Sequence, residues 1–200
     1  MIFGVQWYYW LILAIAIIGA IFAWIKTLSA SRERREKMKK EAAIWRRDYE
    51  LREKYSILTE EKIRQCSDTE LLHAVAMNIQ VQLENAIDMN SAFNSLTEEK
   101  KTIYTLEYFD EDSKINLSEF FKNNGAPLVP NIFNALNAVK ADDLIPFVEV
   151  LYPMYDPDSE ASIDYPLIQK TDEHFKNIYD SDKLCRLAAI YIRNNVTKYL

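Results

Sequence analysis

The sequence predicts an all-α protein built from a single N-terminal transmembrane helix, a helical stalk and a compact multi-helix domain. Three observations predict this fold class. Only 3 Gly and 6 Pro occur in 200 residues, which disfavours a turn-rich all-β fold. Apolar residues recur at helical spacing along the chain, and the alternation typical of strands is nowhere sustained. The composition, 49% hydrophobic and 27% charged, is that of a folded chain rather than a disordered one.

Charge divides the chain into two parts. The formal net charge is −6, but residues 1–55 hold eleven basic and six acidic side chains, whereas residues 56–200 hold thirteen basic and twenty-four acidic ones. Such asymmetry indicates different surroundings for the two parts. The pI near 5.1 argues against a protein that grips nucleic-acid phosphates, and no direct nucleic-acid contact is expected.

Residues 1–6 are read as a short tail before a membrane span at residues 7–25. These nineteen residues carry no charge, and as a helix they would extend about 28 Å, close to the thickness of a hydrocarbon core. Trp7 and Trp24 mark the two ends, where aromatic rings favour the lipid headgroups. A cleaved signal peptide is the alternative, and Ser29-Ala30-Ser31 resembles a cleavage site. The basic start of a signal peptide is absent, so the sequence favours a retained anchor.

The orientation follows from the basic residues after the span. Positive charge is retained on the cytoplasmic side, so we expect a single-pass cell-membrane protein with its N-terminus outside and its C-terminal domain in the cytoplasm. The same side chains can contact anionic lipid headgroups. The predicted membrane-surface residues are Lys26, Arg32, Arg34, Arg35, Lys37, Lys39 and Lys40.

Residues 26–55 predict a basic juxtamembrane stalk. Residues 31–54 are rich in Arg, Glu, Lys and Ala and contain no Gly or Pro, which favours a helix. Met38, Ala42, Trp45 and Tyr49 recur at 4-3-4 spacing, but Arg52 occupies the next position of this stripe. Two heptads are too few to indicate a coiled coil, and packing of the stripe on the following domain is at least as strong an alternative.

The domain at residues 56–200 reads as six helices. Two Ser-x-x-Glu capping boxes, Ser67–Glu70 and Ser95–Glu98, predict the first two helix starts. The first helix is expected to run to Ile87, and the second to bury Ile103, Leu106 and Phe109. Four further helices are expected: one ending at Asn123-Asn124-Gly125, one with Pro130 in its first turn, one capped by Asp142 or Asp143 with Pro146 in its first turn, and one opened by Asp180 or Ser181. Residues 152–165 have the composition of a loop.

The sequence carries little catalytic chemistry. His73 lies beside the apolar stripe of its helix, which suits a hydrogen-bonded packing role, and His174 lies in a charged stretch typical of solvent exposure. Cys66 and Cys185 lack the spacing of a metal or redox site and agree with a reducing compartment. No metalloprotease, serine-hydrolase or P-loop spacing occurs. We expect no enzyme activity and no cofactor.

Residues 109–120 imitate a calcium-binding loop without its essential parts. With Asp110 at position 1 of an EF-hand, Glu119 falls at position 10 rather than 12. The turn glycine is missing, and Lys114 brings positive charge where an oxygen ligand belongs. We therefore interpret this segment as an acidic junction between helices.

Two parts of the domain carry a resemblance to a known family. Residues 117–125 read LSEFFKNNG, and residues 130–139, PNIFNALNAV, follow; near the end come Asp172-Glu173-His174-Phe175 and Tyr191-Ile192-Arg193. These segments resemble the DNA-mimic protein 19 domain family, bacterial helical domains that mostly have no assigned activity. The likeness covers roughly residues 67–195. Where such domains commonly have an Asn-Gly-Gly turn before the Phe-Phe step, this chain has Ser113-Lys114-Ile115-Asn116.

The resemblance implies an all-α domain, and for the family's namesake a dimer whose acidic surface imitates DNA phosphates and engages a DNA-binding protein. Carboxylates on a firm surface attract a basic partner, whereas solvated faces that only keep a domain soluble are the alternative. The predicted partner-binding residues are Asp110, Glu111, Asp112, Asp142, Asp143, Asp156, Asp158 and Glu160. We therefore predict a membrane-anchored, non-enzymatic domain that binds a basic or DNA-binding protein. The alternative is a structural scaffold that acts through self-association, for example as a homodimer.

Overall fold

The structure, a computed structural model, describes residues 35–39, 42–43, 45–46 and 49–200 and divides the chain into two units, Met1–Glu50 and Leu51–Leu200. In the first unit every described residue is helical and exposed. The predicted membrane span at residues 7–25 lies outside the described residues. Within the described ranges, no helix is long and apolar enough to cross a membrane.

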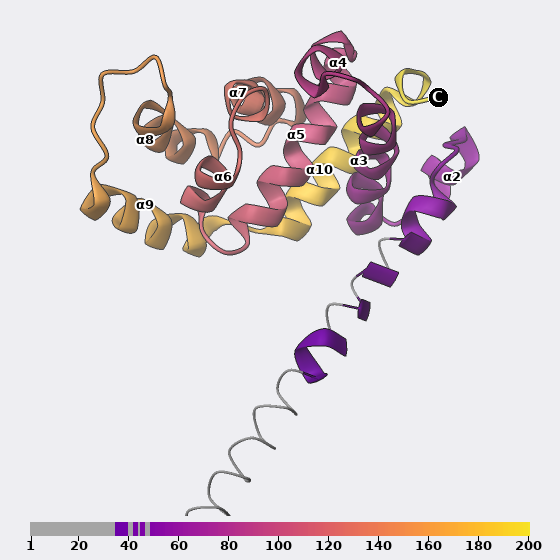
Figure 1. Cartoon of the computed structure of the whole chain (residues 1–200), viewed down its shortest axis with the longest axis horizontal. Coiled ribbons are helices and arrows are strands. Elements are labelled where there is room, and N and C mark those ends of the chain that lie inside the picture. Colours follow the sequence, from indigo (N-terminus) through magenta and orange to yellow (C-terminus); the bar gives the residue numbers. More distant parts are fainter. Residues whose placement is uncertain (1–34, 40–41, 44, 47–48) are drawn as a thin grey trace, which may run out of the picture. The chain divides into compact units, whose positions relative to one another are not determined.

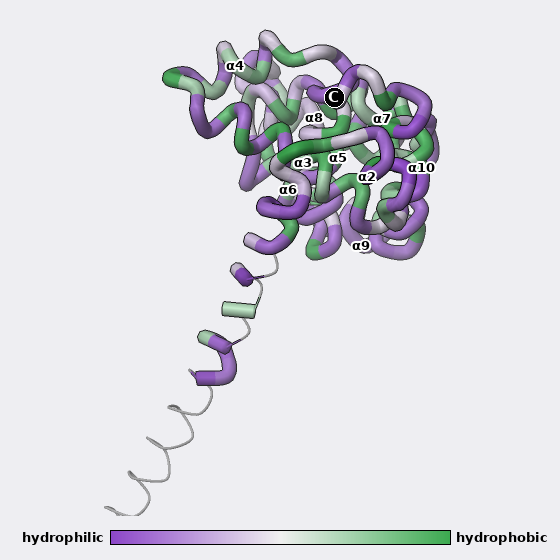
Figure 2. Tube along the Cα trace, turned by 90° about the vertical axis from the view of Figure 1, so that its right-hand side faces the viewer, coloured by the Kyte–Doolittle hydropathy of each residue, from purple (hydrophilic) through white to green (hydrophobic). Residues whose placement is uncertain are grey.

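The second unit is all-α, as predicted. Its described residues contain no strand, and apolar and polar residues mix along its helices, as expected of helices that each bury one face (Figure 2). With the numbering of Figure 1, the helices are α2 Glu60–Gln65, α3 Asp68–Glu84, α4 Met89–Ser95, α5 Glu98–Ser113, α6 Leu117–Asn123, α7 Leu128–Val139, α8 Ile145–Tyr155, α9 Tyr165–Ile178 and α10 Ser181–Asn194, followed by a short 3-10 helix, Val196–Lys198.

Helix α5 is the centre of this unit. It contacts α3, α6, α7 and α10, and its residues Ile103, Leu106 and Phe109 are fully buried, as predicted from their spacing. Helix α10 packs against both α3 and α5, so the last long helix of the unit completes a core that begins with the first long helix, α3. In Figure 1, α2, α3 and α4 lie at one end of the unit and α6, α8 and α9 at the other.

Aromatic rings join α5 to the second end of the unit. The Phe109 ring meets the rings of Phe120 and Phe175 edge-on, with centroids 5.3 Å and 6.3 Å apart. Phe175 in turn stacks on Tyr179 at 4.8 Å and meets Phe147 of α8 at 5.7 Å. Each such pair contributes about 0.5–1.5 kcal/mol beyond the burial of its area. These contacts hold α6, α8 and α9 against α5.

A buried carboxylate also ties α9 to α6. Asp172 of α9 accepts hydrogen bonds from the backbone N–H of Ser118 at 2.9 Å and from its hydroxyl at 2.7 Å. The N-cap residue of α6, Asn116, makes no side-chain cap bond, so Asp172 satisfies a first-turn donor of α6 from another helix.

The helix starts differ from the two predicted capping boxes. Ser67 is the N-cap of α3, as predicted, but its side chain makes no cap bond, and Glu70 instead accepts hydrogen bonds from Tyr55 Oη at 2.8 Å and Lys54 Nζ at 2.7 Å. The second box is displaced. Thr97 rather than Ser95 caps α5, and its Oγ1 accepts from the Lys100 N–H at 3.4 Å.

The predicted N-cap of α8 is also wrong. Its N-cap is Leu144, without a side-chain cap bond, so neither Asp142 nor Asp143 plays the predicted part. Pro146 does lie in the first turn, as expected, and the helix continues to Tyr155, which shortens the predicted loop to residues 156–164. The cap of α10 is confirmed, because Asp180 accepts from the Lys183 N–H at 3.1 Å.

Three helices were not predicted: α2, α4 and α9. As a result, the described part of the second unit holds nine α-helices where the sequence predicts six. Ile87, placed in the apolar stripe of the first long helix, is fully exposed beyond the end of α3. The compact unit runs from Leu51 to Leu200, and Tyr55 is buried in its core.

Candidate interaction surface

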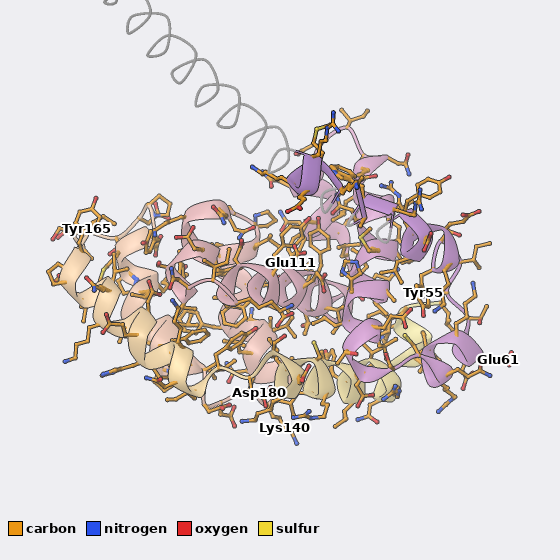
Figure 3. All side chains as sticks on the ribbon, turned by 90° about the horizontal axis from the view of Figure 1, so that it is seen from below. Tyr55, Glu61, Glu111, Lys140, Tyr165 and Asp180 are labelled. Atoms are coloured by element: carbon orange, nitrogen blue, oxygen red, sulfur yellow. The ribbon has the colours of Figure 1, made fainter. Side chains whose placement is uncertain are left out.

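The most acidic stretch of the chain begins near the start of α10 and runs to one end of the second unit (Figure 3). Residues 141–169, named here the acidic segment, contain no Lys or Arg, because the basic residues on either side are Lys140 and Lys170. The segment comprises the turn before α8, α8 itself, the loop to α9 and the first residues of α9. Its acidic residues are Asp142, Asp143, Glu149, Asp156, Asp158, Glu160 and Asp164.

The acidic side chains of this segment face water. Asp156 is half-buried and the others are exposed. Within the part of the chain that the structure describes, only Asp143 of this set forms an ion pair, with Lys183 Nζ at 2.6 Å. Unpaired carboxylates close together produce a negative potential that extends over roughly one Debye length, about 8–10 Å at physiological salt.

Some of these carboxylates also fix the loop between α8 and α9. Asp156 accepts from the Asp158 N–H at 3.1 Å, and Asp164 caps α9 by accepting from the Leu167 N–H at 3.1 Å. The ring of Tyr155 stacks on Phe121 of α6 with centroids 5.3 Å apart, which anchors the C-terminal end of α8. Both ends of the loop are therefore fixed by contacts to its own backbone or to α6. It projects at the end of the unit in Figure 1, and in Figure 3 Tyr165 lies at the opposite end from Glu61.

The outer face of α8 lies beside these acids. This face, defined as Pro146, Glu149, Val150 and Pro153, is exposed, whereas Val148 and Leu151 on the opposite side are buried. Glu149 is the only charged residue among the eleven residues of α8. This face was not predicted from the sequence, although the lack of Lys and Arg from residue 141 to 169 indicates the acidic surroundings in which it lies.

Asp110 differs from the other acids predicted to bind a partner. Only 4% of its surface is exposed, and its carboxylate accepts hydrogen bonds from Tyr179 Oη at 2.5 Å and Ser181 Oγ at 2.6 Å. It also forms an ion pair with Lys114 Nζ at 2.6 Å. Because these internal donors occupy it, the Asp110 carboxylate joins α5 to the α9–α10 junction rather than facing a partner.

The neighbours of Asp110 lie nearer the surface. Asp112 is half-buried and accepts from the side-chain amides of Asn123 at 2.8 Å and Asn124 at 2.6 Å, which links the ends of α5 and α6. Glu111 is exposed, yet partial burial of its carboxyl and the nearby Glu107 carboxylate raise its pKa above the ordinary value. No cluster of three or more His, Cys, Asp or Glu that could hold a metal occurs among the described residues.

The two histidines occupy different settings. His73 Nδ1 makes a hydrogen bond with Glu107 Oε1 between α3 and α5, which agrees with the predicted packing role. His174 is exposed on α9, as predicted. A shallow cavity of about 440 Å³ lies between α6 and α9, and neither histidine lines it. Ser118, which does line it, donates its hydroxyl proton to Asp172.

Both cysteines are buried free thiols. Cys66 Sγ lies 3.2 Å from Tyr55 Oη, and burial raises the pKa of the Cys66 thiol. Burial, with a smaller effect of the Asp110 carboxylate, raises the pKa of Cys185 to about 11. At neutral pH both sulfurs are therefore weak nucleophiles.

The predicted membrane-surface residues are described only in part. Arg35, Lys37 and Lys39 are exposed on the helical stalk. The other four, Lys26, Arg32, Arg34 and Lys40, lie outside the described residues.

Comparison of the chain with protein-family models, with curated proteins and with solved structures finds no match.

Proposed function

We propose that this chain is a single-pass membrane protein whose acidic, non-enzymatic domain binds a basic protein partner in the cytoplasm. One observation carries the proposal: the acidic segment has seven acidic and no basic side chains over residues 141–169, and nearly all of these carboxylates are exposed. A basic protein would gain favourable electrostatic energy along this whole stretch, and the attraction would speed its approach.

The segment suits binding because its ends are already held. Asp156 and Asp164 bond the loop backbone, and Tyr155 stacks on Phe121. A partner would therefore lose less affinity to ordering the loop than it would with a free chain. A solubilising surface needs charge but no fixed arrangement, so these contacts favour recognition over the alternative of a merely solvated face.

The membrane part of the proposal comes from the sequence pattern. An uncharged run at residues 7–25 is followed by a basic cluster, and the described members of that cluster, Arg35, Lys37 and Lys39, are exposed on a helix. Exposed basic side chains beside a bilayer gain about 1 kcal/mol each from anionic headgroups. This supports a cell-membrane protein with its N-terminus outside and with membrane lipid as a second partner.

The resemblance to the DNA-mimic protein 19 domain family suggests the kind of basic partner. A DNA-binding protein has a cationic surface shaped to receive phosphates, and the exposed carboxylates of the acidic segment could occupy it. In this proposal the membrane anchor would hold such a protein away from DNA. Tethering, rather than free competition, would then be the use of the anchor.

A scaffold that self-associates through the stalk is the second candidate. Met38, Trp45 and Tyr49 are 66%, 76% and 68% exposed on the helical stalk and recur on one face. Exposed apolar side chains at this spacing are typical of helices that pair. Crosslinking of the full chain in membranes separates the two candidates, because a strict monomer contradicts the scaffold.

The test uses the full chain in nanodiscs of neutral lipid and asks which cytoplasmic proteins it retains. We expect basic proteins to bind at about 50 mM salt and to be released at about 300 mM. A variant with Asp142, Asp158 and Glu160 changed to Asn, Asn and Gln should retain much less, whereas Glu53→Gln with Glu61→Gln and Asp182→Asn is the matched control. Retention of no basic protein at low salt, or equal retention by both variants, contradicts the proposal.

A further inference from the structure

Helix α8 is apolar all round but covered on one side only. Its sequence, IPFVEVLYPMY, contains a single charged residue. Val148 and Leu151 are buried, five further residues are half-buried against the core, and the outer face alone is exposed. A surface helix normally presents polar residues to water, and a helix that is apolar all round is normally enclosed. The outer face of α8 instead presents Pro146, Val150 and Pro153 around Glu149, at the i, i+3, i+4 and i+7 spacing of one helical face.

The backbone of the same face is also incomplete. Pro153 lies inside α8 and has no N–H, so the carbonyl of Glu149 lacks the donor that an α-helix normally supplies from four residues later. The outer face therefore combines apolar side chains, one carboxylate and a backbone acceptor. Such a combination can receive both apolar groups and N–H donors.

We propose that the outer face of α8, with the adjoining acidic loop at residues 156–164, binds a cationic segment of a protein partner through apolar side chains on one face of that segment. The inference rests on the proposed function and assigns the docking surface. Leu, Met or Val side chains of the partner would cover Val150 and the two prolines. Lys or Arg side chains beside them would meet Glu149, Asp158 and Glu160.

Charge decides among the occupants of this face. A second copy of the chain docked through the same face would bring another acidic segment, with seven acidic and no basic residues, against the first. An anionic bilayer surface would be repelled in the same way. A cationic partner is attracted by the same negative charge that repels a second acidic segment and an anionic bilayer. The charge of the acidic segment therefore selects a cationic partner.

The test measures binding of synthetic peptides to the full chain in neutral-lipid nanodiscs. The probe is a helical peptide with Leu along one face and Lys on both borders of that face, and its control has the same Lys residues with Ser in place of Leu. We expect the Leu-containing peptide to bind about ten-fold more tightly, since burying a few apolar side chains contributes that much.

Single substitutions then locate the surface. Val150, 39% exposed, lies at the centre of the outer face, so V150K should weaken the Leu-containing peptide about ten-fold or more by placing a cation against cationic side chains. The matched control is I190K, because Ile190 is 54% exposed on α10 and I190K adds the same charge elsewhere. The far-UV circular dichroism of both variants should match that of the original chain.

A milder substitution guards against misfolding. V150S keeps the charge and should reduce the preference for the Leu-containing over the Ser-containing peptide. Equal effects of V150K and I190K, or no preference for the Leu-containing peptide, would overturn the assignment of α8 while leaving a salt-sensitive basic partner in place. If neither peptide binds at low salt, both this inference and the proposed function fail.

Discussion

At the scale of single residues, burial divides the carboxylates of the domain into two groups. Glu107, Asp110 and Asp172 are buried, and each accepts hydrogen bonds from side chains or backbone of other helices. Asp158 and Glu160 are exposed and lie in the acidic segment. The residue type alone did not separate the groups, because Asp110 and Asp158 both stand in acidic runs. Asp110 is buried because the α9–α10 junction packs over it.

Glu111 should make stability depend on pH in an unusual direction. Its pKa is raised, so the folded state holds the Glu111 proton more tightly than the unfolded state does. Stability contributed by the protonated form is present below the pKa of an unfolded Glu, about 4.3, and is lost as pH rises through the folded pKa. Glu111→Gln should therefore raise Tm at pH 7 and have little effect near pH 3.

Thermal unfolding of Glu111→Gln at a series of pH values checks this expectation. Glu53→Gln is the control, because Glu53 is exposed and its replacement removes one charge without relieving burial. A gain in Tm that is as large near pH 3 as at pH 7 would show that packing, rather than ionisation of Glu111, separates the variant from the original chain.

At the scale of elements, each helix start depends on one or two capping hydrogen bonds, and the sequence predicts their position only to within a few residues. Both capping boxes predicted a helix in the correct region, yet Thr97 rather than Ser95 caps α5. Ser67 occupies the N-cap of α3 without a side-chain cap bond, and the Glu70 carboxylate of that box accepts from Tyr55 and Lys54 instead of from the Ser67 N–H. A long-range contact has replaced a local one in this case.

Replacement of the two N-cap side chains should therefore have unequal effects. Thr97→Ala removes the acceptor of the Lys100 N–H and should lower the free energy of unfolding by about 1 kcal/mol, whereas Ser67→Ala should lower it by less. Urea unfolding followed by circular dichroism measures both. Equal losses would mean that Ser67 caps α3 in solution as the local sequence suggests.

The elements that the sequence predicted have a long apolar stripe or a residue that marks one of their ends. The buried positions of α5 and α10 follow helical spacing, the Gly after α6 marks its end, and the Pro in the first turn of α7 marks its start. Helices α2 and α4 have six and seven residues, too few to show a period. Helix α9 is mostly polar, but Asp164 followed by Pro166 is a readable start, since Asp caps helices and Pro suits the first turn.

The acidic surface was predictable in part for the same kind of reason. Asp142, Asp143, Asp158 and Glu160 are exposed, as a surface role requires. The outer face of α8 was not predicted from the sequence. Sequence periodicity cannot tell which side of an apolar helix remains uncovered, since the neighbouring helices decide this.

At the scale of the whole molecule, α5 and α10 join segments that lie far apart in the sequence. Tyr199 near the C-terminus donates to the backbone carbonyl of Glu99 at 3.1 Å, and Arg193 donates to the Cys66 carbonyl at 2.7 Å. The core of the second unit therefore depends on its last residues. We expect Cys66 and Cys185, both buried in this core, to become reactive together when it opens.

Thiol labelling tests this expectation. At pH 7 the native thiols should react with an aromatic disulfide reagent at least about 100-fold more slowly than in urea, because burial hides the sulfurs and raises their pKa, that of Cys185 to about 11. Ile190→Cys, at an exposed position of α10, provides a thiol that should react fast in the native state. Fast native labelling of Cys185 would contradict a closed core.

The bond from Asp172 to Ser118 has a consequence for how this domain can diverge. It fixes α9 to α6 directly, and the stacking of Tyr155 on Phe121 fixes the end of α8 to the same helix. The loop between α8 and α9 therefore carries no part of the core. Insertions, deletions and exchanges in residues 157–163 can accumulate there without refolding the rest, so the surface of this loop can change one residue at a time while the helices around it stay in place.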